Sequence, residues 1–451
     1  MKTNALLAET AIRAGRYLDG LDERPVAPSA EAVARLEDLK EEFPDQPTDP
    51  KEVVELLDHL GSPATVGSAG GRYFGFVIGG SLPAALAANW LAGAWDQNAC
   101  IQDMSPVAIA LENIAAGWLL DALGLPSESA LSYVTGATMA NFTALVAARQ
   151  AVLESVGWDV EAQGLFNAPP VTVIVGAEVH PTVLKSLTFL GLGRERVTVV
   201  PVDDQGRFRA EVLPSLSGPT IICLQAGNVN TGAFDPVGLV CEQAHPAGAW
   251  VHVDGAFGLW AAASPKMKKL TLDLEKADSW ATDAHKWLNV PYDCGLAIIK
   301  DPRPLRKAVS ISAAYLPESE RYTPETSRRA RGVEVWAALK SLGRQGLADL
   351  IERTCGLARR FAAGLADAGL TILNVVVLNQ VLVRFGDQAT TAKIIKAVQD
   401  DGVCWCGGTV WQGNPAMRIS VSSWATTERD VDKSLAAIIR VAKRELQGDR
   451  A

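Results

Sequence analysis

The sequence lacks the features that typify nucleic-acid binders, zinc proteins and membrane proteins. Its 42 basic residues are outnumbered by 51 acidic ones, and a net charge of −9 argues against a general nucleic-acid binder, which needs a basic face to neutralise phosphates. The seven cysteines include no pair of CxxC motifs, so we expect reduced, buried thiols and no metal site. The most apolar run, residues 82–95, is too short and too interrupted to span a bilayer.

We also find no internal repeat or low-complexity segment, and we expect no secretory signal peptide. The first residues reach Glu9 before any long apolar run, which is untypical of a secretory signal peptide, so we expect a cytoplasmic protein. Cys404 and Cys406 flank one tryptophan. In a strand their side chains share one face, which favours packing over a redox pair. Hydrophobic residues make up 48% and charged residues 21%, as in a globular chain.

Short apolar runs alternate with helical stretches between residues 66 and 310. The runs are rich in β-branched residues and end in polar or glycine-containing turns, which is typical of buried strands. This alternation predicts an α/β domain with a mostly parallel sheet and helices on both faces. The expected strands are 171–176, 197–200, 220–225, 250–254, 279–283 and 295–300.

The flanking regions have other patterns. Residues 1–65 predict amphipathic helices joined by proline-rich turns, and residues 311–451 predict a smaller α+β domain. The latter should contain a long helix from about Val333, strands over 372–385 and 417–424, and helices over 389–401 and 428–447. We therefore expect three parts, with boundaries near residues 65 and 310.

Two charged residues follow predicted strands, where open α/β sheets bind their ligands. Lys286 comes just after the strand 279–283, and a lysine there can form a Schiff base with a carbonyl cofactor. Asp254 ends the strand 250–254, and a carboxylate there can keep the pyridine nitrogen of pyridoxal 5'-phosphate (PLP) protonated. The small Gly255 and Ala256 leave room for a flat ring. The ordinary alternatives are a solvated loop lysine and an Asp-Gly turn.

Two further segments fit a phosphate-bearing cofactor. Small residues open the helix that follows Thr135, and a helix N-terminus offers free N–H groups to a phosphate. This segment is neither a P-loop nor a GxGxxG fingerprint. His180 follows the strand 171–176, where its ring can stack on a cofactor or cap a helix.

The order of these pieces resembles a known family. TGATMANFTAL, EVHPTVLKS, GNVNTGAFDPV, HVDGAFG and DAHKWLNVPYDCG are similar to motifs of the group II PLP-dependent amino-acid decarboxylases, the aromatic amino acid and glutamate decarboxylase family. The similarity includes RYFGFVIGG and WDQN upstream and SRRARGVEVWAALKSLG and RISVSSWATTERDVD downstream, over about residues 60–440. It implies fold type I, the aspartate aminotransferase type, with a seven-stranded mostly parallel sheet. It also implies a homodimer whose active sites lie at the subunit interface.

The resemblance implies a role for each matching residue. Lys286 corresponds to the lysine that carries PLP, Asp254 to the partner of the pyridine nitrogen, and His180 to the stacked imidazole. Ala256 would pack on the opposite face of the ring. The phosphate would be held near Gly136, Ala137, Thr138, Thr282 and His285.

Two segments depart from the family pattern. Gly227–Asn230 stands where the family commonly has Gly-Thr-Thr, whose threonine approaches the cofactor. The segment LPESERYTPETS is short and offers Tyr322 as the one close candidate for the loop tyrosine that donates a proton after CO2 leaves.

The resemblance favours decarboxylation of an L-amino acid to an amine. The alternatives on the same scaffold are aldehyde-forming oxidative deamination, transamination and carbon–carbon lyase chemistry, or a catalytically silent PLP-fold binding protein. Phe76 and Trp95 make the expected substrate region apolar, which favours an aromatic or bulky apolar substrate, although such residues usually build core. Arg418 and the arginines of 328–331 are typical carboxylate ligands, or else partners in ordinary salt bridges.

Overall fold

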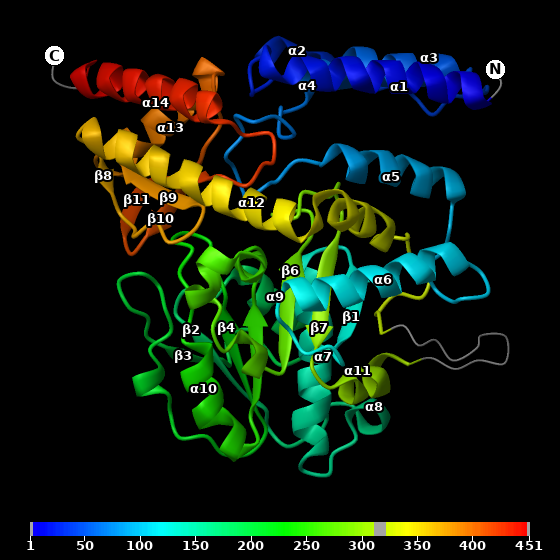
Figure 1. Cartoon of the computed structure of the whole chain (residues 1–451), viewed down its shortest axis with the longest axis vertical. Helices are drawn as coiled ribbons and strands as arrows, with labels where there is room; N and C mark the ends of the chain where they lie inside the picture. The colour runs from blue at the N-terminus through cyan, green and yellow to red at the C-terminus, as the bar shows by residue number, and fades with distance from the viewer. Residues whose placement is uncertain (1–2, 311–321, 449–451) are drawn as a thin grey trace. The chain divides into compact units, whose positions relative to one another are not determined.

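The computed structural model describes residues 3–310 and 322–448, which group into two compact units (Figure 1). The first unit comprises Met1–Gly80, Arg359–Leu373 and Val381–Ala451, and the second comprises Ser81–Ala358 and Asn374–Gln380. This division differs from the expected three parts. In this division the N-terminal helices group with the C-terminal strands, and one boundary lies within α12 (Gly332–Asp367). The long helix expected from about Val333 is broken by a kink at Gly343.

A seven-stranded sheet forms the centre of the second unit and confirms the expected fold class. Its strand order is β1-β7-β6-β5-β4-β2-β3, and only β7 runs antiparallel to its neighbours. The six expected strands are present within one residue at each end. Only β1 was not foreseen, because its five-residue run is interrupted by a serine. The strands are β1 (Ala130–Val134), β2 (Thr172–Gly176), β3 (Thr198–Val200), β4 (Thr220–Gln225), β5 (Trp250–Asp254), β6 (Ser279–Asp283) and β7 (Gly295–Ile299).

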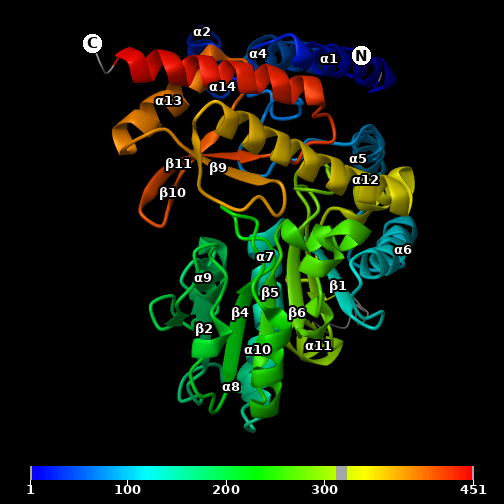
Figure 2. The same ribbon diagram turned by 60° about the vertical axis from the view of Figure 1, so that its left-hand side comes forward.

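Helices cover both faces of this sheet (Figure 2). The longest of them on the sheet is α7, whose alanines allow close packing and whose Leu145 joins a core cluster with Ile221 and Ala281. Helix α10 lies on the opposite face, against β5. The helices of this unit besides α12 are α5 (Pro83–Trp95), α6 (Pro106–Ala122), α7 (Ala137–Glu154), α8 (Val160–Gln163), α9 (Pro181–Phe189), α10 (Val237–Ala244) and α11 (Pro302–Val309).

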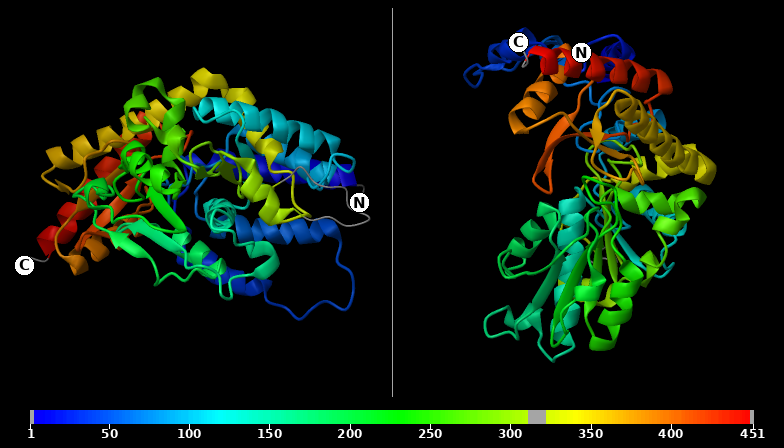
Figure 3. Two further views of the ribbon diagram at one scale, coloured as in Figure 1. Left: turned by 90° about the horizontal axis from the view of Figure 1, so that it is seen from below. Right: turned by 90° about the vertical axis from the view of Figure 1, so that its left-hand side faces the viewer.

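The first unit contains a four-stranded sheet of order β10-β11-β9-β8, with α13 (Gln388–Asp401) and α14 (Glu428–Gly448) packed side by side (Figure 3). The expectation of one strand over 372–385 is wrong. That run forms an antiparallel pair, because the Asn374 side chain donates to the Gln380 carbonyl at 3.0 Å and closes the connection between them. The strands are β8 (Thr371–Ile372), β9 (Gln380–Arg384), β10 (Gly407–Trp411) and β11 (Asn414–Ser420).

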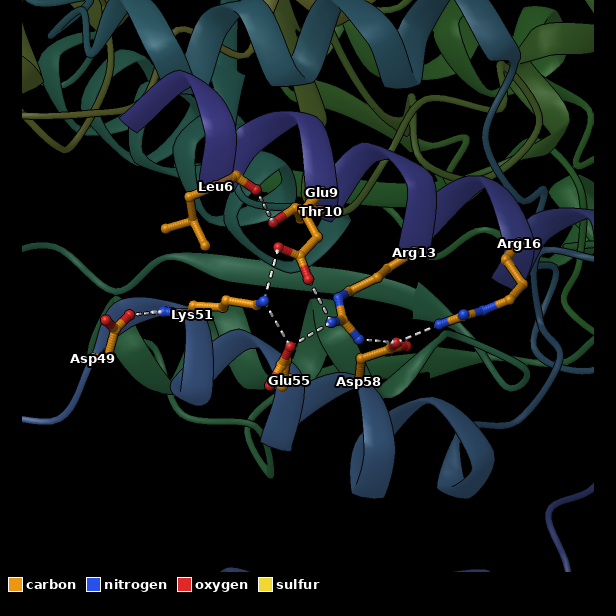
Figure 4. Close-up of polar contacts among 9 residues, drawn as sticks. All are labelled: Leu6, Glu9, Thr10, Arg13, Arg16, Asp49, Lys51, Glu55 and Asp58. Carbon is orange, nitrogen blue, oxygen red and sulfur yellow. Dashed lines mark hydrogen bonds and ion pairs between the residues drawn. The ribbon is translucent and has the colours of Figure 1, made fainter. Parts of the chain in front are cut away.

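The N-terminal helices are joined by charged side chains. Helix α1 contains no buried residue, yet its Arg13 lies 3.1 Å from Glu55 and 3.0 Å from Asp58 (Figure 4). Arg16 adds a 2.7 Å contact to Asp58. Ion pairs therefore hold α1 (Thr3–Asp19) to α3 (Pro50–Leu56) and to the π-helical turn Leu57–Gly61 that continues α3. The short helices α2 (Ala30–Ala34) and α4 (Ser62–Ala64) complete this group. Among the residues that the structure describes, no helix combines the length and apolarity needed to cross a bilayer.

Candidate active site

A pocket of about 320 Å³ lies in the second unit, where the turns after β1, β2, β4, β5 and β6 meet. The carboxyl ends of these strands lie at one edge of the sheet, as the sequence predicts. Its size suits a small-molecule ligand. The pocket is lined by Thr135, Gly136, Ala137, Thr138, Met139, His180, Thr182, Gln225, Gly227, Val229, Asp254, Ala256, Phe257, Asp283, His285 and Lys286.

Lys286 reaches this pocket from the turn that follows β6. Its Nζ lies 3.1 Å from Oδ2 of Asp283, the last residue of that strand. The other oxygen of Asp283 accepts the backbone N–H of Ala137 at 2.6 Å. Asp283 therefore links the lysine to the first turn of α7. Sequence reasoning did not assign Asp283 a role, although it ends a buried strand just as Asp254 does.

Asp254 lies buried at the end of β5. Its Oδ1 accepts the N–H of Ala256 at 3.1 Å, and its Oδ2 accepts the side-chain amide of Asn141 at 3.1 Å. Both carboxylate oxygens are thus held in place by hydrogen bonds. The contact with Asn141 was not foreseen, because that residue lies on α7 and is distant in the sequence.

His180 caps a helix, and its side chain also lines the pocket. Its Nδ1 accepts the N–H of Thr182 at 3.3 Å and lies 2.8 Å from the Thr182 hydroxyl, so it caps α9. The same imidazole lines the pocket. The capping contact fixes the imidazole in the turn that follows β2. Thr182 also lines the pocket and was not foreseen.

The turn before α7 lies close to the start of β7. A Cβ added at Gly295 would lie 2.4 Å from the carbonyl carbon of Gly136, so glycine is required for this approach. Gly136, Ala137 and Thr138 all line the pocket. The Ala137 N–H, one of the donors expected to bind the phosphate, is bonded to Asp283 Oδ1 at 2.6 Å.

His285 and Thr282 occupy different positions relative to the pocket. His285 lines it, accepts the N–H of Cys294 at 3.1 Å and packs against the Tyr292 ring at 4.3 Å. Burial lowers the pKa of His285. Thr282 is buried, donates to the Ala256 carbonyl at 3.4 Å and is not among the lining residues.

The remaining expected residues do not line this pocket. Tyr322 packs its partly buried ring against the core cluster around α7, and residues 311–321 of the preceding segment lie outside the described residues. Trp95 ends α5 and is 41% exposed. Phe76 and Arg418 belong to the first unit, where Phe76 packs near Trp405 and burial lowers the pKa of Arg418.

The arginines of residues 328–331 form ion pairs with carboxylates of their own unit. Arg328 binds Glu112 in a bidentate manner at 2.6 and 2.8 Å, and both side chains are buried. Arg329 lies 3.0 Å from Glu334, and Arg331 lies 2.9 Å from Asp293. The salt-bridge alternative therefore describes these three residues.

Comparisons with known proteins agree with this geometry. Residues 35–385 match the pyridoxal-dependent decarboxylase conserved domain. An aromatic-L-amino-acid decarboxylase of Bacillus atrophaeus is 26% identical over 78% of this chain and 75% of its own length. An acidic amino acid decarboxylase of Bos taurus is 27% identical over 64% of this chain, and the match spans only 58% of that relative. The crystal structure of Oryza sativa TDC with PLP and tryptamine superposes with a TM-score of 0.90, at 21% identity, covering 98% of this chain and 97% of the other.

The fold, the pocket and the matched domain define the class of protein. This chain belongs to the pyridoxal-dependent decarboxylase family, and its cofactor is PLP. The residues around the pocket fit that group, since an amine, a buried carboxylate and a helix N-terminus surround one cavity of suitable size.

Proposed function

We propose that this chain decarboxylates an L-amino acid with an aromatic or bulky apolar side chain, yielding the amine and CO2, with PLP carried on Lys286. The observation that carries the proposal is the meeting of Lys286, Asp254 and His180 around one pocket. When bound, PLP supplies an electron sink for the bond that breaks at the α-carbon. The protein selects that bond by holding it perpendicular to the ring.

Each group of the pocket has a distinct task in this proposal. Lys286 would carry the cofactor, and Asp283 Oδ2, at 3.1 Å from Nζ, would orient its amine. Asp254 would pair with the pyridine nitrogen, while His180 and Ala256 would contact the two ring faces. The first turn of α7, with Gly136 and Thr138 and with Thr282 and His285 nearby, binds the phosphate, since a helix N-terminus attracts anions.

The preference for an apolar substrate is supported by the residues at hand. Met139, Val229 and Phe257 line the pocket, and among its described lining residues there is no arginine to bind a second carboxylate. Arg328 is committed to Glu112. Phe76, Trp95 and Arg418 remain proposed substrate contacts, with Arg418 assigned to the substrate carboxylate.

The cofactor assignment is tested by borohydride reduction followed by mass mapping. Reduction should fix PLP irreversibly to Lys286, because the bond between them is reducible. The Lys286→Ala protein should take up no covalent label, whereas Lys185→Ala, on the neighbouring helix α9, should be labelled like the wild type. An adduct on any lysine other than Lys286 refutes the assignment.

The reaction is tested with a panel of amino acids assayed for CO2, amine, aldehyde and ammonia. Decarboxylation predicts CO2 and amine in equal amounts, with aromatic substrates ahead of glutamate and aspartate. Release of ammonia and aldehyde without amine would favour the oxidative alternative. A higher rate with acidic amino acids would overturn the substrate preference while leaving the reaction type in place.

We also propose a cytoplasmic homodimer. Free, buried thiols at all seven cysteines support a reducing compartment. A surface with many exposed large apolar side chains supports self-association, since apolar surfaces are typically covered by a partner. Sedimentation should give twice the mass of one chain. The surface lies on α5, α6 and the segment between them and includes Trp90, Leu91, Trp95, Met104, Val107, Ile114 and Trp118.

A further inference from the structure

Five side chains form a continuous chain of hydrogen bonds beneath the pocket. Strand alternation places Trp250, His252 and Asp254 of β5 on one face of the sheet. On the same face, β6 contributes Ser279, whose Cα lies opposite His252 in the parallel ladder. Helix α7 covers this face and contributes Asn141.

The contacts run in one line from the core to the pocket. The Trp250 indole donates to Ser279 Oγ at 2.9 Å, and Ser279 Oγ lies 2.9 Å from His252 Nδ1. His252 Nε2 lies 2.9 Å from Asn141 Oδ1. The Asn141 amide then donates to Asp254 Oδ2 at 3.1 Å. His252, Ser279 and Asn141 are fully buried.

The chemistry of the donors fixes one direction for the whole chain. The Asp254 carboxylate can only accept, so the Asn141 NH2 group faces Asp254 and the Asn141 carbonyl oxygen faces His252 Nε2. A neutral His252 therefore carries its proton on Nε2 and donates it to that oxygen, which leaves Nδ1 to accept the Ser279 hydroxyl proton. The Trp250 indole, which can only donate, donates to Ser279 Oγ. Burial lowers the pKa of His252 to about 4, which agrees with a neutral ring.

We propose that Asn141, His252 and Ser279 are positioning residues that hold the Asp254 carboxylate against the pyridine nitrogen of the cofactor. The inference rests on the role proposed for Asp254. We call the chain of hydrogen bonds from Trp250 to Asp254 the relay. Its last member, the Asn141 amide, donates to Asp254 Oδ2 while the Ala256 N–H donates to Oδ1, so the carboxylate cannot rotate away from the pocket. The relay should therefore raise the affinity only for a ligand that has a ring nitrogen to pair with Asp254.

The test compares the binding of two ligands to the protein stripped of cofactor. One is PLP, and the other is its carbocyclic analogue, in which C–H replaces the pyridine nitrogen. Wild-type protein should bind PLP more tightly than the analogue. Asn141→Leu keeps the side-chain size and removes the donor, so PLP affinity should fall about tenfold or more, as for a lost hydrogen bond to a charged group. Affinity for the analogue should stay within about twofold, because the relay has nothing to act on in that ligand.

Thr143→Val is the matched control. Thr143 is also fully buried on α7, but its hydroxyl bonds only to Met139 of its own helix, at 2.7 Å. This variant should bind both ligands like the wild type. Ser279→Ala provides a milder second variant should Asn141→Leu fail to fold, and it should weaken PLP binding selectively but to a smaller extent.

The outcomes separate the inference from the proposed function. Equal weakening of both ligands in Asn141→Leu and Ser279→Ala, or no weakening of either, overturns the relay while Asp254 keeps its role. If the wild type binds PLP and the analogue with equal affinity, the role proposed for Asp254 is wrong, and the proposal for the relay, which depends on it, is wrong as well. Selective loss of PLP affinity in both variants, with normal binding in Thr143→Val, supports the relay.

Discussion

At the scale of single residues, two aspartates end neighbouring strands yet have different surroundings. Asp254 accepts hydrogen bonds from the uncharged amides of Asn141 and Ala256. Asp283 contacts the charged amine of Lys286 and the first turn of α7. Asp283 lies beside the lysine, so we expect it to orient the Lys286 amine. Asp254 accepts from uncharged amides, so we expect its charge to act on the cofactor ring.

Replacing Asp254 with alanine should lower turnover without unfolding the protein. Loss of a charge-assisted hydrogen bond at a site of this kind costs roughly 3 kcal/mol, which is about a hundredfold in rate. The measurement is kcat at saturating PLP, beside circular dichroism. Asp278→Ala is the control, since Asp278 accepts the Val251 N–H at the opposite end of β5, at 2.8 Å. Near-normal turnover in a folded Asp254→Ala protein would show that Asp254 only stabilises its turn.

Replacing Tyr322 with phenylalanine should change the products. We propose Tyr322, although it is not among the lining residues of the pocket, as the proton donor to the α-carbon after CO2 leaves. The substitution keeps the ring and its packing and removes only the phenol proton. Amine formation should slow, and reaction with O2 should release aldehyde, ammonia and hydrogen peroxide instead. The measurement is the ratio of amine to aldehyde under air for wild type and variant, with Tyr292→Phe as a second tyrosine control. An unchanged ratio at an unchanged rate removes Tyr322 from the mechanism.

Sequence reasoning located the residues that end strands but not the residues that support them. Lys286, Asp254 and His180 were identifiable because each lies at the end of a predicted strand or in the turn after it. Asn141 and Thr182 lacked such a signal, since their partners come from other strands and helices. A local pattern encodes which face a side chain occupies, whereas contacts between distant segments depend on how helices and strands pack.

At the scale of elements, buried strands were well predicted, and the irregular connection of the smaller sheet was not. Continuous apolar runs are typical of parallel strands buried on both faces, and β4 follows this rule. Polar residues interrupt β5 and β6, yet both strands are buried along their whole length. The run over 372–385 has the same apolarity, but Asn374 and Asn379 interrupt it. Asparagine side chains compete for backbone partners, as the Asn374 contact to Gln380 illustrates.

The close approach of β7 to the turn before α7 leads to a prediction about cofactor binding. In Gly295→Ala the new Cβ would lie 2.4 Å from Gly136, so the turn must shift. Overpacking of this kind costs about 1–3 kcal/mol, and PLP affinity should fall about tenfold as the phosphate donors move. Gly356→Ala is the control, because a Cβ there meets no atom within 4 Å. Equal PLP dissociation constants for the two variants would contradict the assigned phosphate site.

At the scale of the whole molecule, the buried relay links stability to pH. Burial lowers the pKa of His252 to about 4, and the nearby Asp254 opposes this shift only in part. The unfolded chain regains an ordinary histidine pKa of about 6.5. The folded protein therefore binds fewer protons than the unfolded chain between these values. Stability from this residue is complete above about pH 6.5 and is lost progressively as the pH falls toward 4.

This difference corresponds to about 3 kcal/mol at the acid end of the window. We expect the thermal midpoint of the wild type to fall between pH 7 and pH 5, with a smaller fall in His252→Gln, where no ring remains to be protonated. His285, whose pKa burial also lowers, contributes in the same direction and is present in both proteins. Cys223, which pairs with His252 across β4 and β5, stays neutral because burial raises its pKa to about 12.

The control for this experiment is His245→Gln. His245 is 40% exposed on its side chain and lies 3.2 Å from Asp278, at the opposite end of β5 from the pocket. Its removal should leave the acid-dependent fall of the wild type intact. If the thermal midpoint falls by the same amount between pH 7 and pH 5 in the wild type and in His252→Gln, the His252 ring is not held neutral. The direction assigned to the hydrogen bonds from Trp250 to Asp254 would then be wrong as well.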